Sequence, residues 1–166
     1  MKNLEITTSK IYTWDQIIKQ CAVWRFKEKK IVFTNGCFDI LHLGHIEYLA
    51  KSQDLGGVLI VGLNSDASVK KIKGPNRPIN DEHARAMFLA SLSFVHAVVL
   101  FNQETPYELI QSIHPDILVK GQDYSVEQIV GNDIVRANSG EIKTVELTHG
   151  YSTTRIIEKI KESFHD

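Results

Sequence analysis

Short runs of apolar, β-branched residues alternate along this chain with longer stretches in which apolar positions recur at helical spacing. The apolar runs occupy residues 31–34, 58–63, 96–101, 117–119 and 142–147. Within each run the apolar residues are nearly continuous, which is typical of strands covered on both faces. The helical stretches occupy residues 13–28, 43–54, 81–94, 105–112 and 152–164.

This alternation predicts an α/β fold, a Rossmann-like three-layer α/β/α arrangement with a five-stranded parallel sheet. The length of 166 residues is typical of one domain, with residues 1–29 expected as a helical extension packed on it. Residues 152–164 place their apolar side chains on one stripe, so we expect this helix to dock on the sheet. Residues 70–80 are predicted to form the longest irregular loop.

The composition excludes several classes of protein. The net charge of −1 offers no general basic footprint for nucleic acid. No apolar run approaches the roughly 18 residues that span a bilayer, and the start of the chain lacks the apolar stretch of a signal peptide. The two cysteines, Cys21 and Cys37, show no disulfide framework. We therefore expect a cytoplasmic protein that binds neither membrane nor nucleic acid.

Unusual residues follow the first predicted strand. Gly36 permits a tight turn, and His42 and His45 flank Gly44 where a helix is predicted to begin. A helix start offers free N–H groups and a positive dipole, which favour phosphate. One alternative is two unrelated surface histidines, which the whole motif at a strand-to-helix junction disfavours. The other is a metal site, but further ligands at Cys/His spacing are missing. Cys37 has no evident base partner, which disfavours a nucleophilic role.

Two further segments carry groups that bind phosphate. The predicted loop holds Lys70, Lys71, Lys73 and Arg77 in a nearly neutral protein, with a solvated basic loop as the alternative interpretation. Ser152 precedes the last amphipathic stretch and is a predicted N-cap. Thr153 and Thr154 add two hydroxyl groups there, which favours phosphate binding over a plain cap.

Five motifs occur in a family-specific order: TNGCFDILHLGH, VGLNSD, KGPNRP, LVKGQDY and YSTTRII. Through them, residues 30–161 resemble the HxGH nucleotidyltransferases of the cytidylyltransferase-like family. More narrowly, they resemble the adenylyltransferase half of the bifunctional heptose-phosphate kinase/adenylyltransferases, which make ADP-heptose for lipopolysaccharide. The resemblance implies transfer of AMP from ATP to a sugar 1-phosphate, with D-glycero-D-manno-heptose 1-phosphate as the expected acceptor and pyrophosphate as the second product.

The resemblance also implies roles for particular residues. Catalytic roles fall on His42, His45, Lys73 and Asp39. Asp39 would lie near the acceptor phosphate and near Mg²⁺, which would be held mainly by the phosphates of the substrate ATP. Nucleotide-binding roles fall on Asn35, Gly36, Cys37, Phe38, Gly44, Asp66, Arg77, Arg85, Gly121, Asp123, Tyr124, Ser152, Thr153 and Thr154.

Several alternatives remain open at this level. Related cytidylyltransferases carry an arginine shortly before the STT motif, and residues 147–150 contain none, which favours the heptose-phosphate type. A glycerol-3-phosphate cytidylyltransferase and an FAD-synthase-like adenylyltransferase are the enzymatic alternatives. A nucleotide-binding sensor is the non-enzymatic one, although intact His42 and His45 argue against it. Relatives imply a homodimer or higher homo-oligomer, and a separate kinase would have to supply the substrate.

Overall fold

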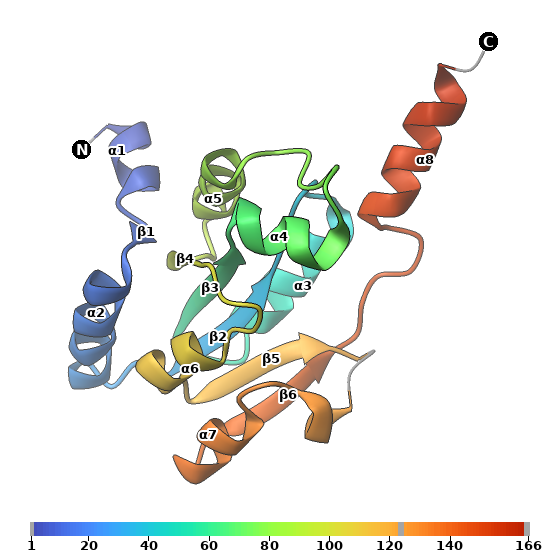
Figure 1. The fold of residues 1–166 in the computed structure, drawn as a ribbon. Helices are drawn as coiled ribbons and strands as arrows, with labels where there is room; N and C mark the ends of the chain where they lie inside the picture. Colours follow the sequence, from blue (N-terminus) through green and yellow to red (C-terminus); the bar gives the residue numbers. More distant parts are fainter. Residues whose placement is uncertain (1, 123–124, 165–166) are drawn as a thin grey trace.

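The computed structural model describes residues 2–122 and 125–164 (Figure 1). The strands are β1 (Ile11–Tyr12), β2 (Ile31–Gly36), β3 (Val58–Asn64), β4 (Ala97–Phe101), β5 (Ile117–Gly121) and β6 (Glu141–Val145). The α-helices are α1 (Asn3–Thr8), α2 (Trp14–Phe26), α3 (Leu43–Gln53), α4 (Asp66–Lys73), α5 (Glu82–Ser91), α6 (Tyr107–Ile113), α7 (Asn132–Ala137) and α8 (Thr153–Ser163). A short 3₁₀ helix, η1 (Val126–Gln128), precedes α7.

In the described residues the strands form one parallel sheet in the order β1-β4-β3-β2-β5-β6. All five predicted strands are present, so the predicted α/β fold with a parallel sheet is confirmed. The predicted strand count was wrong, because Ile11 and Tyr12 add a sixth strand that pairs with Val98 and Val99 of β4. A strand of two residues is too short to produce a hydrophobic pattern in the sequence.

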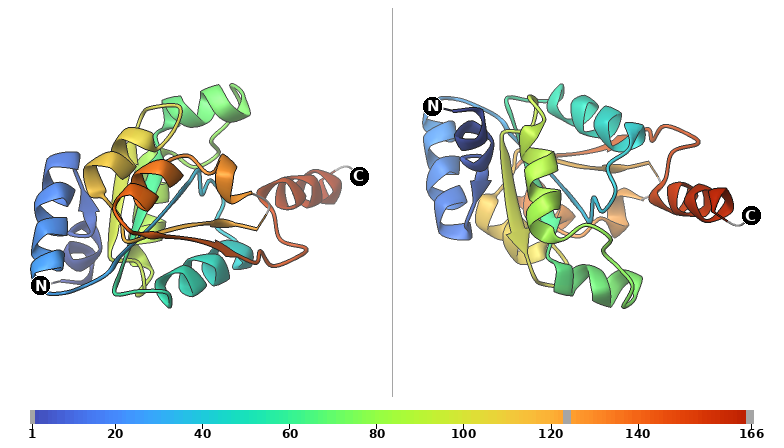
Figure 2. Two further views of the ribbon diagram at one scale, coloured as in Figure 1. Left: turned by 90° about the horizontal axis from the view of Figure 1, so that it is seen from below. Right: turned by 90° about the horizontal axis from the view of Figure 1, so that it is seen from above.

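Helices cover both faces of the sheet, as Figure 2 shows for α3 on one side and α6 and α7 on the other. One core joins α2, α6 and α7 to the sheet, and its helical members include Ile17 and Ile110. The opposite core joins α3 and α5 to the sheet through residues such as Leu49 and Leu89. Successive residues of β2 alternate between the two cores, with Val32 in one and Phe33 in the other. This explains the continuous apolar runs.

The region predicted as an irregular loop begins inside a helix. Residues 70–73 form the last turn of α4, so the prediction of a loop over 70–80 was wrong at its start. The side chain of Ser65 caps α4, and the fully buried Val69 holds the helix against the molecule. Three lysines dominate the last turn and obscure this helix in the sequence, although cations there favour the helix dipole.

The last helix does not pack as the sequence predicted. None of the residues of α8 is buried, and the Phe164 side chain that follows it is 82% exposed. Both figures show α8 extending away from the sheet. The prediction that this helix docks on the sheet was therefore wrong. Helices α3 and α7 already lie against β6, so little sheet surface remains for α8 to cover.

The strand order reverses direction between β2 and β5. From β2 the chain continues outward through β3 and β4, whereas β5 and β6 lie on the other side of β2. In open parallel sheets, ligands bind at such a switch point, beyond the carboxyl ends of the strands. The topology therefore directs attention to the ends of β2 and β5.

Candidate active site

A cavity of about 470 Å³ opens at this switch point, within the size range of small-molecule sites. Its wall combines the turn after β2, the first turns of α3, the end of α4, the end of β5 and the segment before α8. The predicted residues that line it are Asn35, Gly36, Cys37, Phe38, Asp39, His42, Gly44, His45, Lys73, Gly121, Ser152, Thr153 and Thr154. The fold thus gathers segments that are distant in the sequence.

Three predicted nucleotide-binding residues are not in the cavity wall, namely Asp66, Arg77 and Arg85. Two others, Asp123 and Tyr124, lie outside the described residues. The binding roles of all five stay predictions.

The two histidines form a stacked pair at the start of α3. Their ring centroids lie 3.8 Å apart with an interplanar angle of 20°, and Phe38 contacts the His45 ring edge-on at 5.2 Å. The buried Nδ1 atoms of His42 and His45 make no hydrogen bond within the described residues. Both histidines line the cavity, where a ligand would contact their rings.

The environment keeps the histidine pair neutral near pH 7. Burial lowers the pKa of His45 to about 4, and the positive charges of His42 and Lys73 add to this effect. A contact with the backbone of Ile40 raises the pKa of His45 and so opposes part of this effect. Burial also lowers the pKa of His42. A bound triphosphate would supply the missing negative charge and favour protonation of the pair.

Gly44 allows this stacking. A Cβ atom at position 44 would lie 3.2 Å from Nδ1 of His42 and 3.4 Å from Cβ of Tyr151. A larger side chain would therefore press on the His42 ring and on the segment before α8. The glycine of the HxGH motif thus serves local packing as well as access to the helix start.

Asp39 anchors the chain that follows α4. Its carboxylate accepts bonds from Arg77 Nε at 2.6 Å and from the backbone N–H groups of Ile79 and Asn80 at 2.8 and 3.0 Å. The Asn80 side chain also donates to the Asp39 carbonyl at 2.7 Å. Asp39 is only 2% exposed. Both carboxylate oxygens are engaged, so the geometry favours an anchoring role, and contact with an acceptor or a metal stays a prediction.

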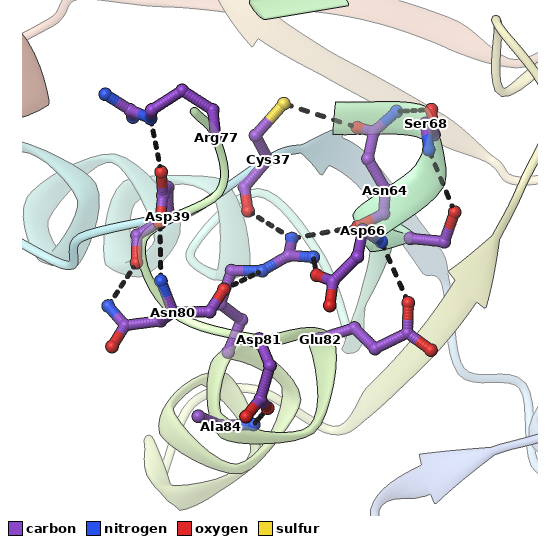
Figure 3. A network of polar contacts seen from close by, with 12 residues as sticks. Cys37, Asp39, Asn64, Asp66, Ser68, Arg77, Asn80, Asp81, Glu82 and Ala84 are labelled. Carbon is purple, nitrogen blue, oxygen red and sulfur yellow. Dashed lines mark hydrogen bonds and ion pairs between the residues drawn. The ribbon is translucent and has the colours of Figure 1, made fainter. Parts of the chain in front are cut away.

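A second buried charge belongs to the polar network around Cys37, Asn64 and Asp66, which Figure 3 shows. Arg85 is fully buried and donates to the carbonyl oxygens of Cys37 at 2.7 Å, Asn64 at 2.8 Å and Asn80 at 3.0 Å. It also forms an ion pair with Asp66 at 2.6 Å. Because these bonds join the turn after β2 to the end of β3, Arg85 and Asp66 shape the cavity wall.

Lys73 and Cys37 complete this side of the cavity. Lys73 ends α4, and its exposed side chain reaches the cavity wall, whereas Lys70 and Lys71 are not part of that wall. Burial raises the pKa of the Cys37 thiol despite the nearby positive charges of Lys73 and Arg85. A thiol with a raised pKa is a poor nucleophile at neutral pH, in agreement with the sequence analysis.

Ser152, Thr153 and Thr154, which we call the STT segment, also line the cavity. The Ser152 side chain accepts a bond from the backbone N–H of Arg155 at 3.1 Å, so the predicted N-cap is present. The STT segment at the start of α8 and the histidine pair thus line the same cavity.

The sequence analysis missed five residues of the cavity wall: Tyr48, Lys120, Leu147, Thr148 and Tyr151. Lys120 Nζ donates to the side-chain oxygen of Asn35, which joins the ends of β5 and β2. Its place beside Gly121, at the end of a predicted strand, could have identified it. Tyr48 shares a 2.8 Å hydrogen bond with Thr34 and donates to the Val119 carbonyl at 3.1 Å.

The described residues contain no cluster of three or more metal-ligating side chains. No helix in residues 2–122 and 125–164 is long and apolar enough to cross a membrane.

The sequence profile of the cytidylyltransferase-like family matches residues 33–159, which include every described segment of the cavity wall. The chain belongs to the cytidylyltransferase-like family. The family predicted from the HxGH and STT motifs is thereby confirmed. The residues of the HxGH and STT motifs lie together at the β2/β5 switch point of this chain.

Individual proteins similar to this chain include two bifunctional proteins and one solved structure. The chain is 49% identical to the bifunctional protein HldE of Citrifermentans bemidjiense over 94% of its length, and 58% identical to that of Campylobacter jejuni subsp. doylei over 82%. These matches cover 32% and 29% of the two relatives, so the chain spans about a third of their length. A crystal structure of the lipopolysaccharide core biosynthesis protein from Thermoplasma volcanium superposes with a TM-score of 0.58 and 29% identity, covering 72% of this chain and 97% of that one.

Proposed function

We propose that this protein transfers the adenylyl group of ATP to D-glycero-D-manno-heptose 1-phosphate, giving ADP-heptose and pyrophosphate. The observation that carries the proposal is the stacked pair of His42 and His45, which lines one cavity together with Lys73 and the STT segment. Such a site suits a chain of phosphates. The similarity to the HldE proteins supports the choice of acceptor.

In the proposed reaction, an oxygen of the acceptor phosphate attacks the α-phosphorus of ATP in line. The bond from the α-phosphorus to the bridging oxygen breaks, and pyrophosphate leaves with the electron pair. The histidine pair and Lys73 would stabilise the charge that moves onto the leaving group, and the STT segment would hold its oxygens. Catalysis would then rest on positioning and electrostatics, without a covalent enzyme intermediate.

We propose that Mg²⁺ accompanies the ATP phosphates, because this ion keeps water and phosphate ligands more readily than a full protein cage. Omitting Mg²⁺ should reduce turnover, whereas the fold of the protein without nucleotide should be unaffected by chelators.

The decisive experiment is a screen for pyrophosphate release. It crosses ATP, CTP and GTP with heptose 1-phosphate, glycerol 3-phosphate and FMN. Release with ATP and heptose 1-phosphate alone supports the proposal. Release with CTP and glycerol 3-phosphate would assign a cytidylyltransferase instead, and nucleotide binding without any release would favour a sensor.

We also propose a homodimer or higher homo-oligomer in the cytoplasm. The oligomer is supported by the exposed apolar side chains of α8 and its end, among them Ile160 at 51% and Phe164 at 82% exposure. The free thiols of Cys21 and Cys37 suit a reducing compartment. Light scattering after size exclusion tests the assembly, and a monomer at micromolar concentration would exclude it. Fractionation of cells tests the location.

A further inference from the structure

The segment between β6 and α8, residues 146–152, supplies three residues to the cavity wall ahead of the STT motif: Leu147, Thr148 and Tyr151. It ends at Ser152, the first residue of the STT segment, and Thr153 and Thr154 begin α8, a helix that buries no residue and so does not fix their position. Figure 1 shows α8 extending beyond the body of the protein. Something in the segment before α8 must therefore fix the position of the hydroxyl groups.

Two contacts connect this segment to α3. The hydroxyl of Thr148 donates a hydrogen bond to the carboxylate of Glu47, which lies two residues after His45. Tyr151 backs onto Gly44, where an added Cβ would lie 3.4 Å from the tyrosine Cβ. Both contacts end on the helix that carries the histidine pair. The segment before α8 is thus joined to the helix that begins at the histidine pair.

Burial indicates that Thr148 is the fixed point of the segment. Glu146, Leu147, His149 and Gly150 are all exposed, whereas Thr148 between them is partly buried. Glu47 is also partly buried, but it is not a residue of the cavity wall. The contact that links Glu47 to the cavity wall on the side of the STT segment is its bond with Thr148.

We propose that Glu47 is a positioning residue: by holding Thr148, it sets the place of the STT segment relative to the histidine pair and so controls triphosphate binding. The inference rests on the proposed function, since it concerns the same cavity. A hydrogen bond to a charged carboxylate is stronger than one between neutral groups. Without it, the STT segment would have to be ordered by each incoming ATP, and that entropy would weaken binding.

The test measures the affinity for a non-hydrolysable ATP analogue by calorimetry, together with kinetics and melting temperature. Glu47→Leu removes the acceptor, and leucine has a helix propensity similar to that of glutamate. Glu47→Gln keeps an acceptor oxygen. Thr148→Val removes the hydroxyl at nearly constant shape. The control is Glu108→Leu, because Glu108 accepts a side-chain bond from Gln103 at 3.0 Å and does not line the cavity.

We expect Glu47→Leu and Thr148→Val each to weaken analogue binding about tenfold, or about 1.4 kcal/mol, and to raise KM for ATP more than they lower kcat. The double variant should be no weaker than either single one, because both remove the same contact. Glu47→Gln should recover most of the affinity, and Glu108→Leu should match the wild type.

Two results would overturn the inference while leaving the proposed function in place. One is wild-type affinity in a folded Glu47→Leu protein whose wild type binds ATP and releases pyrophosphate. The other is additive losses in the double variant, which would mean that Glu47 and Thr148 act separately. A wild-type protein that binds neither the analogue nor ATP would overturn both proposals. A lowered melting temperature with unchanged KM would reduce Glu47 to a purely structural role.

Discussion

The lowered pKa of His45 predicts a specific sensitivity of the fold to acid. In the folded protein, burial and neighbouring positive charge lower the pKa of His45 to about 4, whereas in the unfolded chain a histidine titrates near 6.5. Between these values the unfolded chain binds a proton that the folded protein does not. The contribution of His45 to the free energy of unfolding is therefore fully present above about pH 6.5, and it is lost as the pH drops toward 4.

The size of this effect follows from the shift. Each pKa unit corresponds to about 1.4 kcal/mol, so the shift of His45 amounts to about 3 kcal/mol at most once partial solvent contact is allowed for. A typical domain has about 5–15 kcal/mol of stability. Replacing the histidine by a group that does not titrate should thus remove a substantial part of the acid sensitivity.

The assay is urea unfolding of the wild type and of His45→Gln at several pH values between 7.5 and 4.5. We expect the free energy of unfolding to fall more steeply in the wild type, with the difference growing below pH 6.5. The control is His149→Gln, because His149 is exposed. Parallel curves for wild type and His45→Gln would refute the buried, neutral state of His45.

The same reasoning predicts that ATP binding takes up protons. Triphosphate beside the pair should raise the pKa of His45 and His42, so affinity should increase as the pH falls from 8 toward 6. Calorimetry in buffers of different ionisation enthalpy measures the proton uptake. His45→Gln should show less uptake, and we expect a loss in kcat of roughly 10²-fold or more, the scale of losing one transition-state donor. Equal uptake and normal turnover in His45→Gln would exclude the phosphate role.

Four further predictions address other parts of the site. Lys73→Ala should weaken ATP binding, and added salt should reproduce part of that loss because exposed charges are screened. Unchanged ATP affinity in this variant would mean that Lys73 is only a solvated residue at the end of its helix. Thr153→Val should raise KM for ATP or lower kcat with melting temperature nearly unchanged, whereas lost stability with normal kinetics would contradict the phosphate role of the STT segment. Asp39→Asn should cost about 2–3 kcal/mol in urea unfolding, because it breaks a largely buried ion pair, and wild-type stability would exclude the anchoring role. A comparison of kcat/KM for ATP and CTP with the same acceptor should show that ATP is preferred. The opposite preference would mean that the protein is a cytidylyltransferase.

The hydrophobic pattern predicted the strands that are covered on both faces of the sheet. The continuous apolar runs in β2 and β3 have only one explanation, a sheet covered on both faces. The two-residue strand β1 leaves no such signature, and its pairing with β4 depends on tertiary contacts. Helix α8 is the opposite case. Its apolar stripe is typical of a helix with one buried face, but the stripe does not identify the surface that packs against that face.

The sequence predicted the residues of the cavity that lie in motifs at the carboxyl ends of strands. It did not predict those whose place in the cavity depends on contacts between distant segments. His42, His45, Lys73 and the STT segment all line the cavity, as the topology of a parallel sheet requires. Lys120 was missed because a single lysine at the end of a strand has no distinctive pattern. Thr148 was missed because its position depends on a contact with Glu47, 101 residues away in sequence.

Arg85 and Asp39 show why residue type alone cannot separate a ligand-binding charge from a structural one. Both are charged residues within or near family motifs, yet the Arg85 side chain is fully buried and its guanidinium is satisfied by three carbonyl groups and Asp66. A guanidinium so engaged would leave several acceptors unpaired if it turned toward a phosphate, which is costly in a buried position. We therefore expect a mutation at Arg85 to displace Cys37 and Asn64, and a direct contact of Arg85 with the nucleotide stays a prediction. Loss of activity on mutation is consequently no proof of contact, and only a variant that loses ATP affinity at unchanged stability identifies a residue that touches the nucleotide.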